Sequence, residues 1–141
     1  MDKCFFEKFS LVLRLALERG LVSFDGVDVK FDYSPINVFR KLKGNTVQDD
    51  DFKSQAELYG EGLLNRWPNN SNAEKDIGNY SCSFFDDLEN LKKLFSPKRN
   101  YTFAKGILKK EHGAVCHETS GHIHCWCYEN SNIKESFEVI V

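Results

Sequence analysis

The hydrophobic positions in the first part of the chain recur with helical spacing and then with alternating spacing. Over residues 2–19 apolar side chains repeat every three or four positions, and Gly20 follows them, which predicts a helix with a wide buried face. Residues 21–24 and 27–33 flank an Asp-Gly pair, and apolar and polar positions alternate in the second segment. This pattern predicts a β-hairpin with one face in solvent.

Two further helical patterns follow in the first half. Ser34 and Pro35 are typical of a helix start and Gly44 of a helix end, so residues 34–44 predict a short helix. A third helix is predicted over residues 52–67, where three aspartates at 49–51 would lie at the positive end of the helix dipole. The asparagine-rich residues 68–80 predict a loop.

The second half of the chain combines one helical pattern with three strand patterns. Residues 83–95 carry an apolar stripe with acids early and lysines late, which predicts a fourth helix that ends before Pro97. Residues 101–115, 122–128 and 136–141 predict strands separated by polar turns. This half is therefore expected to be a helix followed by an antiparallel meander of three strands.

These elements predict one α+β domain over residues 1–141, with about four helices, an N-terminal β-hairpin and a C-terminal meander. Residues 1–67 hold the first helices and the hairpin, residues 68–80 the loop, and residues 81–141 the last helix and the sheet. The 141 residues include 12 Phe and are 41% hydrophobic, so a core can form without disulfides or metals.

Charge and cysteine content limit the partners and the cellular compartment that we expect for this protein. Nineteen basic and 21 acidic residues give a formal net charge of -2, which argues against nucleic-acid binding or a membrane-surface role. Charges at Glu7, Lys8 and Arg14 interrupt the first apolar stretch, so neither a leader peptide nor a membrane span is expected. Five cysteines are an odd number without secretory context, which predicts reduced thiols in the cytoplasm.

A cysteine directly before the fourth predicted helix is the first candidate for chemistry. Thiols at helix N-termini are activated when a histidine lies nearby to take the proton. Cys82 has this expected position, and the strand at 122–128 offers His124 as the base, with His122 as the alternative. Glu138 and Glu135 from the next strand are the candidates that would orient the imidazole, and Asn130 is a further alternative. The first hypothesis is a thiol hydrolase or acyltransferase acting on a protein or peptide substrate.

The order of these elements resembles the core of papain-like and transglutaminase-like cysteine enzymes. The resemblance covers residues 79–141 and lies in Asn-Tyr-Ser-Cys at 79–82, the helical pattern at 84–95, the strand pattern at 101–106, and His-Ile-His-Cys-Trp at 122–126. It implies Cys82 as nucleophile, and the His-x-Trp strand of those families implies His124 as base. Those families commonly have an Asp soon after this strand, whereas this chain has Glu138.

A second cluster of residues could bind zinc. Cys116, His117, His122, His124, Cys125 and Cys127 are six potential ligands within twelve residues. Strand alternation separates the two later histidines from the two later cysteines, so one ion cannot collect all four. A site could combine Cys116 or His117 with one of these two pairs, and the zinc hypothesis is the set Cys116, His122 and His124. Its alternative is a cysteine pair packed in the core. No Gly-rich phosphate loop is present, so no nucleotide cofactor is expected.

Basic residues concentrate in one stretch of the chain. Residues 92–110 contain seven bases and no acid, including Lys105, Lys109 and Lys110, which could bind an anionic partner. A solvated helix end and strand face is the simpler interpretation. The stretch supports a second functional hypothesis, a non-enzymatic protein-binding inhibitor, immunity or counter-defence factor, and a structural zinc module is the third.

Overall fold

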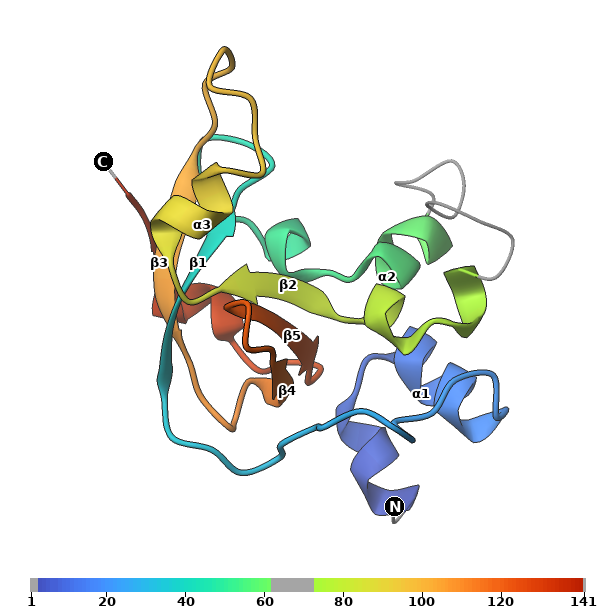
Figure 1. The fold of residues 1–141 in the computed structure, drawn as a ribbon. Helices are drawn as coiled ribbons and strands as arrows, with labels where there is room; N and C mark the ends of the chain where they lie inside the picture. Colours follow the sequence, from blue (N-terminus) through green and yellow to red (C-terminus); the bar gives the residue numbers. More distant parts are fainter. Residues whose placement is uncertain (1–2, 62–72, 141) are drawn as a thin grey trace.

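The computed structural model describes residues 3–61 and 73–140, which form an α+β fold around one antiparallel sheet (Figure 1). The strand order is β4-β5-β2-β1-β3-β6. The strands are β1 (Ile36–Lys41), β2 (Cys82–Phe85), β3 (Phe103–Leu108), β4 (Gly113–His117), β5 (His122–Cys127) and β6 (Phe137–Val139). The ladder β2–β5 joins the hairpin β4–β5 to the other strands, so it places the residues of β5 beside the segment that leads into β2.

Short helices surround the sheet. The α-helices of the described residues are α1 (Leu11–Glu18), α2 (Gln55–Gly60) and α3 (Leu88–Lys92). The 3-10 helices are η1 (Lys3–Lys8), η2 (Asp49–Phe52), η3 (Ala73–Lys75), η4 (Ile77–Tyr80) and η5 (Ile133–Ser136). Figure 1 shows α1 and α3 at opposite sides of the molecule with strands between them. No helix in these described ranges is long and apolar enough to cross a membrane.

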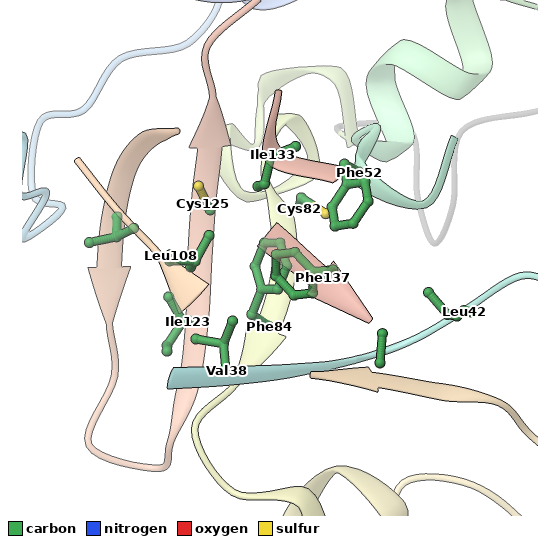
Figure 2. Close-up of a cluster of buried hydrophobic side chains, with 12 residues drawn as sticks. Val38, Leu42, Phe52, Cys82, Phe84, Leu108, Ile123, Cys125, Ile133 and Phe137 are labelled. Atoms are coloured by element: carbon green, nitrogen blue, oxygen red, sulfur yellow. The ribbon is translucent and has the colours of Figure 1, made fainter. Parts of the chain in front are cut away.

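Three aromatic rings organise the core on one face of the sheet. The Phe137 ring centroid lies 5.0 Å from that of Phe52 and 5.5 Å from that of Phe84. Figure 2 shows this cluster, in which Cys82 and Cys125 project toward the same interior. Phe84 is completely buried, and a shift of β2 by one residue would turn this ring to the other face of the sheet, so its burial favours the observed register.

A second core lies on the other face of the sheet and is covered by the N-terminal segment. Trp126 of β5 is buried here and packs edge-on against Phe24 at 5.0 Å between centroids. Phe9 and Leu13 belong to the same cluster. Because neighbouring residues of a strand point to opposite faces, β5 contributes Cys125 to the first core and Trp126 to the second.

The structure confirms the α+β class and corrects the elements predicted for the N-terminal part of the chain. The predicted hairpin at residues 21–33 is absent: this segment has no paired strands, and Lys30 forms an isolated bridge with Val115. The helix predicted over residues 34–44 is strand β1 instead. Spacing at Ile36, Phe39 and Leu42 fits a helix, but pairing with β2 on one side and β3 on the other satisfies the backbone along a strand.

The helix predicted over residues 83–95 is also wrong in its first turns. Residues 82–85 form β2, and α3 begins only after Asp87, whose carboxylate accepts hydrogen bonds from the backbone N–H groups of Glu89 and Asn90 at 2.8 and 3.2 Å. The true N-cap is therefore this aspartate rather than Cys82. Strand pairing with β5 accounts for the first part of the apolar stripe, which alternates between the two sheet faces.

The predicted C-terminal meander is wrong. β4 and β5 pair at one end of the sheet and β3 and β6 at the other, with β2 and β1 between them.

The remaining predicted boundaries change in smaller ways. The predicted strand at 101–115 is two strands, β3 and β4, joined by a turn in which the His112 N–H donates to the Lys109 carbonyl at 2.9 Å. The helix predicted over 52–67 is limited to η2 and α2 as far as the structure describes it, and residues 62–67 lie outside the described residues. Of the predicted loop at 68–80, residues 68–72 lie outside the described residues, and η3 and η4 occupy the rest.

Candidate functional site

A cavity of about 690 Å³ lies where η4, α2 and the strands β2 and β5 meet. Its wall includes Ser81, Glu118 and His124, together with the half-buried Arg40. Ser81 follows η4 directly, His124 lies in β5, and Glu118 lies in the turn between β4 and β5. Three separate segments thus bring a hydroxyl, an imidazole and a carboxylate to one wall.

His124 connects the other two groups through its two ring nitrogens. Its Nδ1 lies 2.9 Å from Ser81 Oγ, and its Nε2 lies 2.9 Å from Glu118 Oε1. An ionised carboxylate only accepts hydrogen bonds, so a neutral His124 must carry its proton on Nε2. Nδ1 then presents a lone pair that can accept the hydroxyl proton of Ser81. This order of donors and acceptors is that of a nucleophile, a base and an orienting acid.

Ser81 is held in place by its surroundings. The residue is only 6% exposed, and its Oγ also lies 2.8 Å from the Gly78 carbonyl, which is a second acceptor for the same proton. The preceding helix η4 is fixed to β5 because Trp126 Nε1 donates to the Ile77 carbonyl at 2.9 Å. The indole therefore ties the Ser81 segment to the strand that carries His124.

Glu118 is positioned by a closed turn. The backbone N–H of Glu118 donates to the His122 carbonyl at 2.9 Å, and that of Gly121 donates to the Glu118 carbonyl at 3.0 Å. Gly121 has a φ of +96°, which favours glycine. His117 Nε2 lies 2.8 Å from Asp86 Oδ2, and this contact joins the turn to the segment after β2.

Cys82, the predicted nucleophile, is a core residue in the structure. It begins a strand rather than a helix, is 2% exposed, and has Cys125 as its partner in the β2–β5 register. Residues opposite each other in a ladder share a face, so Cys82 faces the first core while Ser83 shares a face with His124. Although Cys82 also borders the cavity, burial raises the pKa of its thiol well above the ordinary value. The helix-terminus argument for an activated thiol therefore fails.

The predicted orienting acid, Glu138, lies away from His124. It is in β6 at the edge of the sheet, whereas β5 is next to the opposite edge. Its carboxylate pairs with Lys105 Nζ at 3.5 Å. Glu118 is the carboxylate that contacts the His124 ring, and sequence reasoning missed both it and Ser81. The sequence feature that pointed to Glu118 is its position in the polar turn between the predicted strands at 101–115 and 122–128, the second of which begins His-x-His.

His122, the alternative base, approaches the same carboxylate. Its Nδ1 lies 3.8 Å from Glu118 Oε2, and its ring stacks on Phe85 with centroids 5.0 Å apart. Burial and the neighbouring His124 lower the pKa of His122, which favours the neutral ring at neutral pH. In the described part of the chain, Glu118, His122 and His124 are the group whose ligand atoms all lie within 4.8 Å of one another.

The predicted zinc set differs from this group by one residue. Cys116 is opposite His124 in the β4–β5 register, but it is outside the group of ligand atoms. Cys125 and Cys127 lie on the other face of β5, as alternation predicts, with their sulfurs 3.8 Å apart. His117 is engaged with Asp86 instead.

The predicted basic cluster is exposed and mostly paired with acids. Lys105 contacts Glu138, and Lys110 Nζ lies 3.7 Å from Asp32 Oδ1. Lys109 lies with Lys110 in the turn between β3 and β4. Surface ion pairs of this kind contribute little stability, and they reduce the positive field available to an anionic partner. The inhibitor hypothesis stays a prediction.

No family model, curated protein or solved structure matches this chain.

Proposed function

We propose that this protein is a small acyl hydrolase or acyltransferase in which Ser81 is the nucleophile, His124 the base and Glu118 the acid that orients it. The observation that carries the proposal is the continuous hydrogen-bond chain from Ser81 through His124 to Glu118 on the wall of the cavity. It retains the reaction class and the base expected from the sequence, with a hydroxyl in place of the Cys82 thiol.

The chemistry follows from the donor order in this chain. Ser81 Oγ attacks the carbonyl carbon of an ester or amide while its proton moves to His124 Nδ1. Glu118 stabilises the resulting imidazolium through Nε2–H. The proton on Nδ1 then passes to the leaving group as its bond to carbon breaks, which leaves Ser81 acylated. Water, deprotonated by His124, releases the acid and restores the hydroxyl.

The Gly78 carbonyl gives Ser81 a resting state. A hydroxyl has one proton, so Ser81 can donate either to Gly78 at 2.8 Å or to His124 at 2.9 Å. Attack requires the second arrangement, which is favoured when His124 is neutral and Glu118 ionised.

The setting proposed for this activity is the cytoplasm, with a protein or peptide substrate. The mixed polar wall of the cavity, which includes Arg40 and Asn79, supports a substrate with hydrogen-bonding groups.

The test compares hydrolysis of p-nitrophenyl acetate and of a peptide thioester by the wild type and by Ser81→Ala. We expect the variant to lose roughly a thousandfold or more in kcat/KM while it keeps its fold, because the hydroxyl supplies the attacking oxygen. Ser83→Ala is the matched control: Ser83 is opposite His124 in the register, but its hydroxyl makes no hydrogen bond to the ring among the described residues.

A third variant separates the serine proposal from the thiol prediction. Cys82→Ala should keep the activity, with some loss of stability because the side chain is buried in the first core. Loss of activity in Cys82→Ala together with retention in Ser81→Ala would replace the serine mechanism by the thiol mechanism. A wild-type protein without hydrolysis of either substrate above the buffer rate would contradict both.

A further inference from the structure

We propose that Glu118, His122 and His124 form a binding site for a divalent transition-metal ion of the zinc class, and that the bound ion switches the Ser81–His124–Glu118 chain off. The binding site stands on geometry alone, whereas the switch rests on the proposed function. Both histidines are on one face of β5, and the turn before this strand supplies the carboxylate.

The spacing of the ligand atoms fits such an ion. Zinc binds imidazole nitrogens and carboxylate oxygens at about 2.0–2.2 Å, so two ligands of a tetrahedral site are on the order of 3.4 Å apart. His124 Nε2 lies 2.9 Å from Glu118 Oε1, and His122 Nδ1 lies 3.8 Å from Glu118 Oε2. These two distances bracket the required value, so an ion could enter after small side-chain movements.

The contacts around His124 also fit a metal ligand. A ligating histidine usually donates its other ring N–H to a neighbouring acceptor, which fixes the ring. Ser81 Oγ, 2.9 Å from Nδ1, can be that acceptor, because its own proton can turn to the Gly78 carbonyl 2.8 Å away. Ser81 thus has hydrogen-bond partners in both states of His124.

The two states exclude each other at one atom. In the hydrolase chain Nε2 carries a proton and Nδ1 a lone pair, whereas a metal ion on Nε2 requires a lone pair there and moves the proton to Nδ1. The Nδ1–H then points at Ser81 and cannot accept its proton. The same ion also occupies the carboxylate that would stabilise the imidazolium. Metal binding therefore removes the base and its orienting acid together.

The number of protein ligands leaves one coordination position of the ion open. Structural zinc sites use four protein ligands, whereas this group offers three and leaves a position for water. Cys116, the nearest additional thiol in the register, is outside the group. Glu118 in the turn is exposed and the two histidines of β5 are partly exposed, so a chelator in solution can reach the ion, as a reversible switch requires.

The binding experiment titrates zinc chloride into protein that has been treated with a chelator and dialysed, with isothermal titration calorimetry as the readout. We expect one site in the wild type and at least about tenfold weaker binding in His122→Ala. His117→Ala is the matched control, because His117 lies in the same hairpin but contacts Asp86. Equal affinities of wild type and His122→Ala, or no binding at all, would overturn the site.

A wild-type measurement keeps the test decisive if a variant fails to fold. The chain has four histidines, so the imidazole C–H signals can be followed by NMR during titration with cobalt(II). Paramagnetic shifts should be largest for His122 and His124 and small for His112. Shifts of another distribution would refute the assignment.

The switch is tested separately on the hydrolysis of p-nitrophenyl acetate. Activity should fall in proportion to zinc occupancy and return when a chelator is added. Full activity at zinc saturation would overturn the switch while leaving the metal site in place. Zinc binding by a wild type that hydrolyses nothing would instead contradict the proposed function and support the site. Ser81→Ala should still bind zinc, because Ser81 is not a ligand.

Discussion

Ser81 and His124 are 43 residues apart in the sequence, yet their side chains are hydrogen-bonded at 2.9 Å. The β2–β5 ladder places the residue before β2 beside β5, and the Trp126 indole fixes the helix before Ser81 to β5. The contact therefore depends on a packing residue that takes no part in the chemistry.

Trp126→Phe should weaken both the fold and the site. Loss of the indole N–H leaves the Ile77 carbonyl without its donor, and the smaller ring leaves space in the second core. We expect a decrease of about 1–3 kcal/mol in the free energy of unfolding, measured with urea, together with lower hydrolysis. Unchanged activity at reduced stability would show that this anchor does not position Ser81.

Cysteine alkylation should follow burial rather than the predicted nucleophile. Cys116 is partly exposed, whereas Cys82 and Cys125 are 2% and 0% exposed. Burial also raises the pKa of the Cys82 thiol well above its ordinary value, so little thiolate forms at neutral pH. With iodoacetamide and site mapping by mass spectrometry, Cys116 should react before the other two. Rapid labelling of Cys82 in the folded protein would restore it as a nucleophile candidate.

The sequence predicts best those strands whose hydrophobic pattern fits a strand and does not also fit a helix. Residues 122–127 alternate between the two faces of the sheet and match β5 closely. Residues 36–42 fit both a helix and a strand, and only pairing with β2 and β3 decides between them. Local spacing cannot contain that information, because the partners are distant in the chain.

The candidate site was predictable only in part for the same reason. His124 follows from the strand pattern, but its hydrogen-bond partners depend on the β2–β5 register and on the turn that presents Glu118. A helix that began after Cys82 would place the thiol at a helix N-terminus, and this incorrect helix start is why the thiol was predicted as the nucleophile. The strand that forms there directs Cys82 into the core, and Ser81, one residue earlier, contacts the imidazole.

Gly121→Ala should disturb the turn that presents Glu118. The new Cβ would lie 2.5 Å from Asp86 Oδ1, and a φ of +96° is unfavourable for alanine. We expect a loss of about 1–2 kcal/mol in unfolding free energy, together with weaker zinc binding and lower hydrolysis. Gly44→Ala is the control, because a Cβ at Gly44 would meet nothing within 4 Å. Equal effects of the two substitutions would contradict this role of the turn.

His112 should make the protein less stable in mild acid. The imidazole is 6% exposed, its Nδ1 accepts a hydrogen bond from the Lys109 backbone N–H at 3.0 Å, and burial lowers its pKa below the ordinary 6.5. The unfolded chain therefore binds this proton more tightly than the folded one. The stabilisation is fully present above pH 6.5 and is lost as the pH falls through the folded-state pKa.

The free energy of unfolding of the wild type and of His112→Gln, measured with urea between pH 5 and pH 8, reports this contribution. The pH range spans the ordinary histidine pKa of 6.5. The wild type should lose stability toward pH 5, and the variant should show a smaller slope because it lacks the titrating ring. His122, whose pKa is also lowered, contributes a slope of the same sign in both proteins. Identical slopes for the two proteins would mean that His112 keeps its ordinary pKa in the folded state.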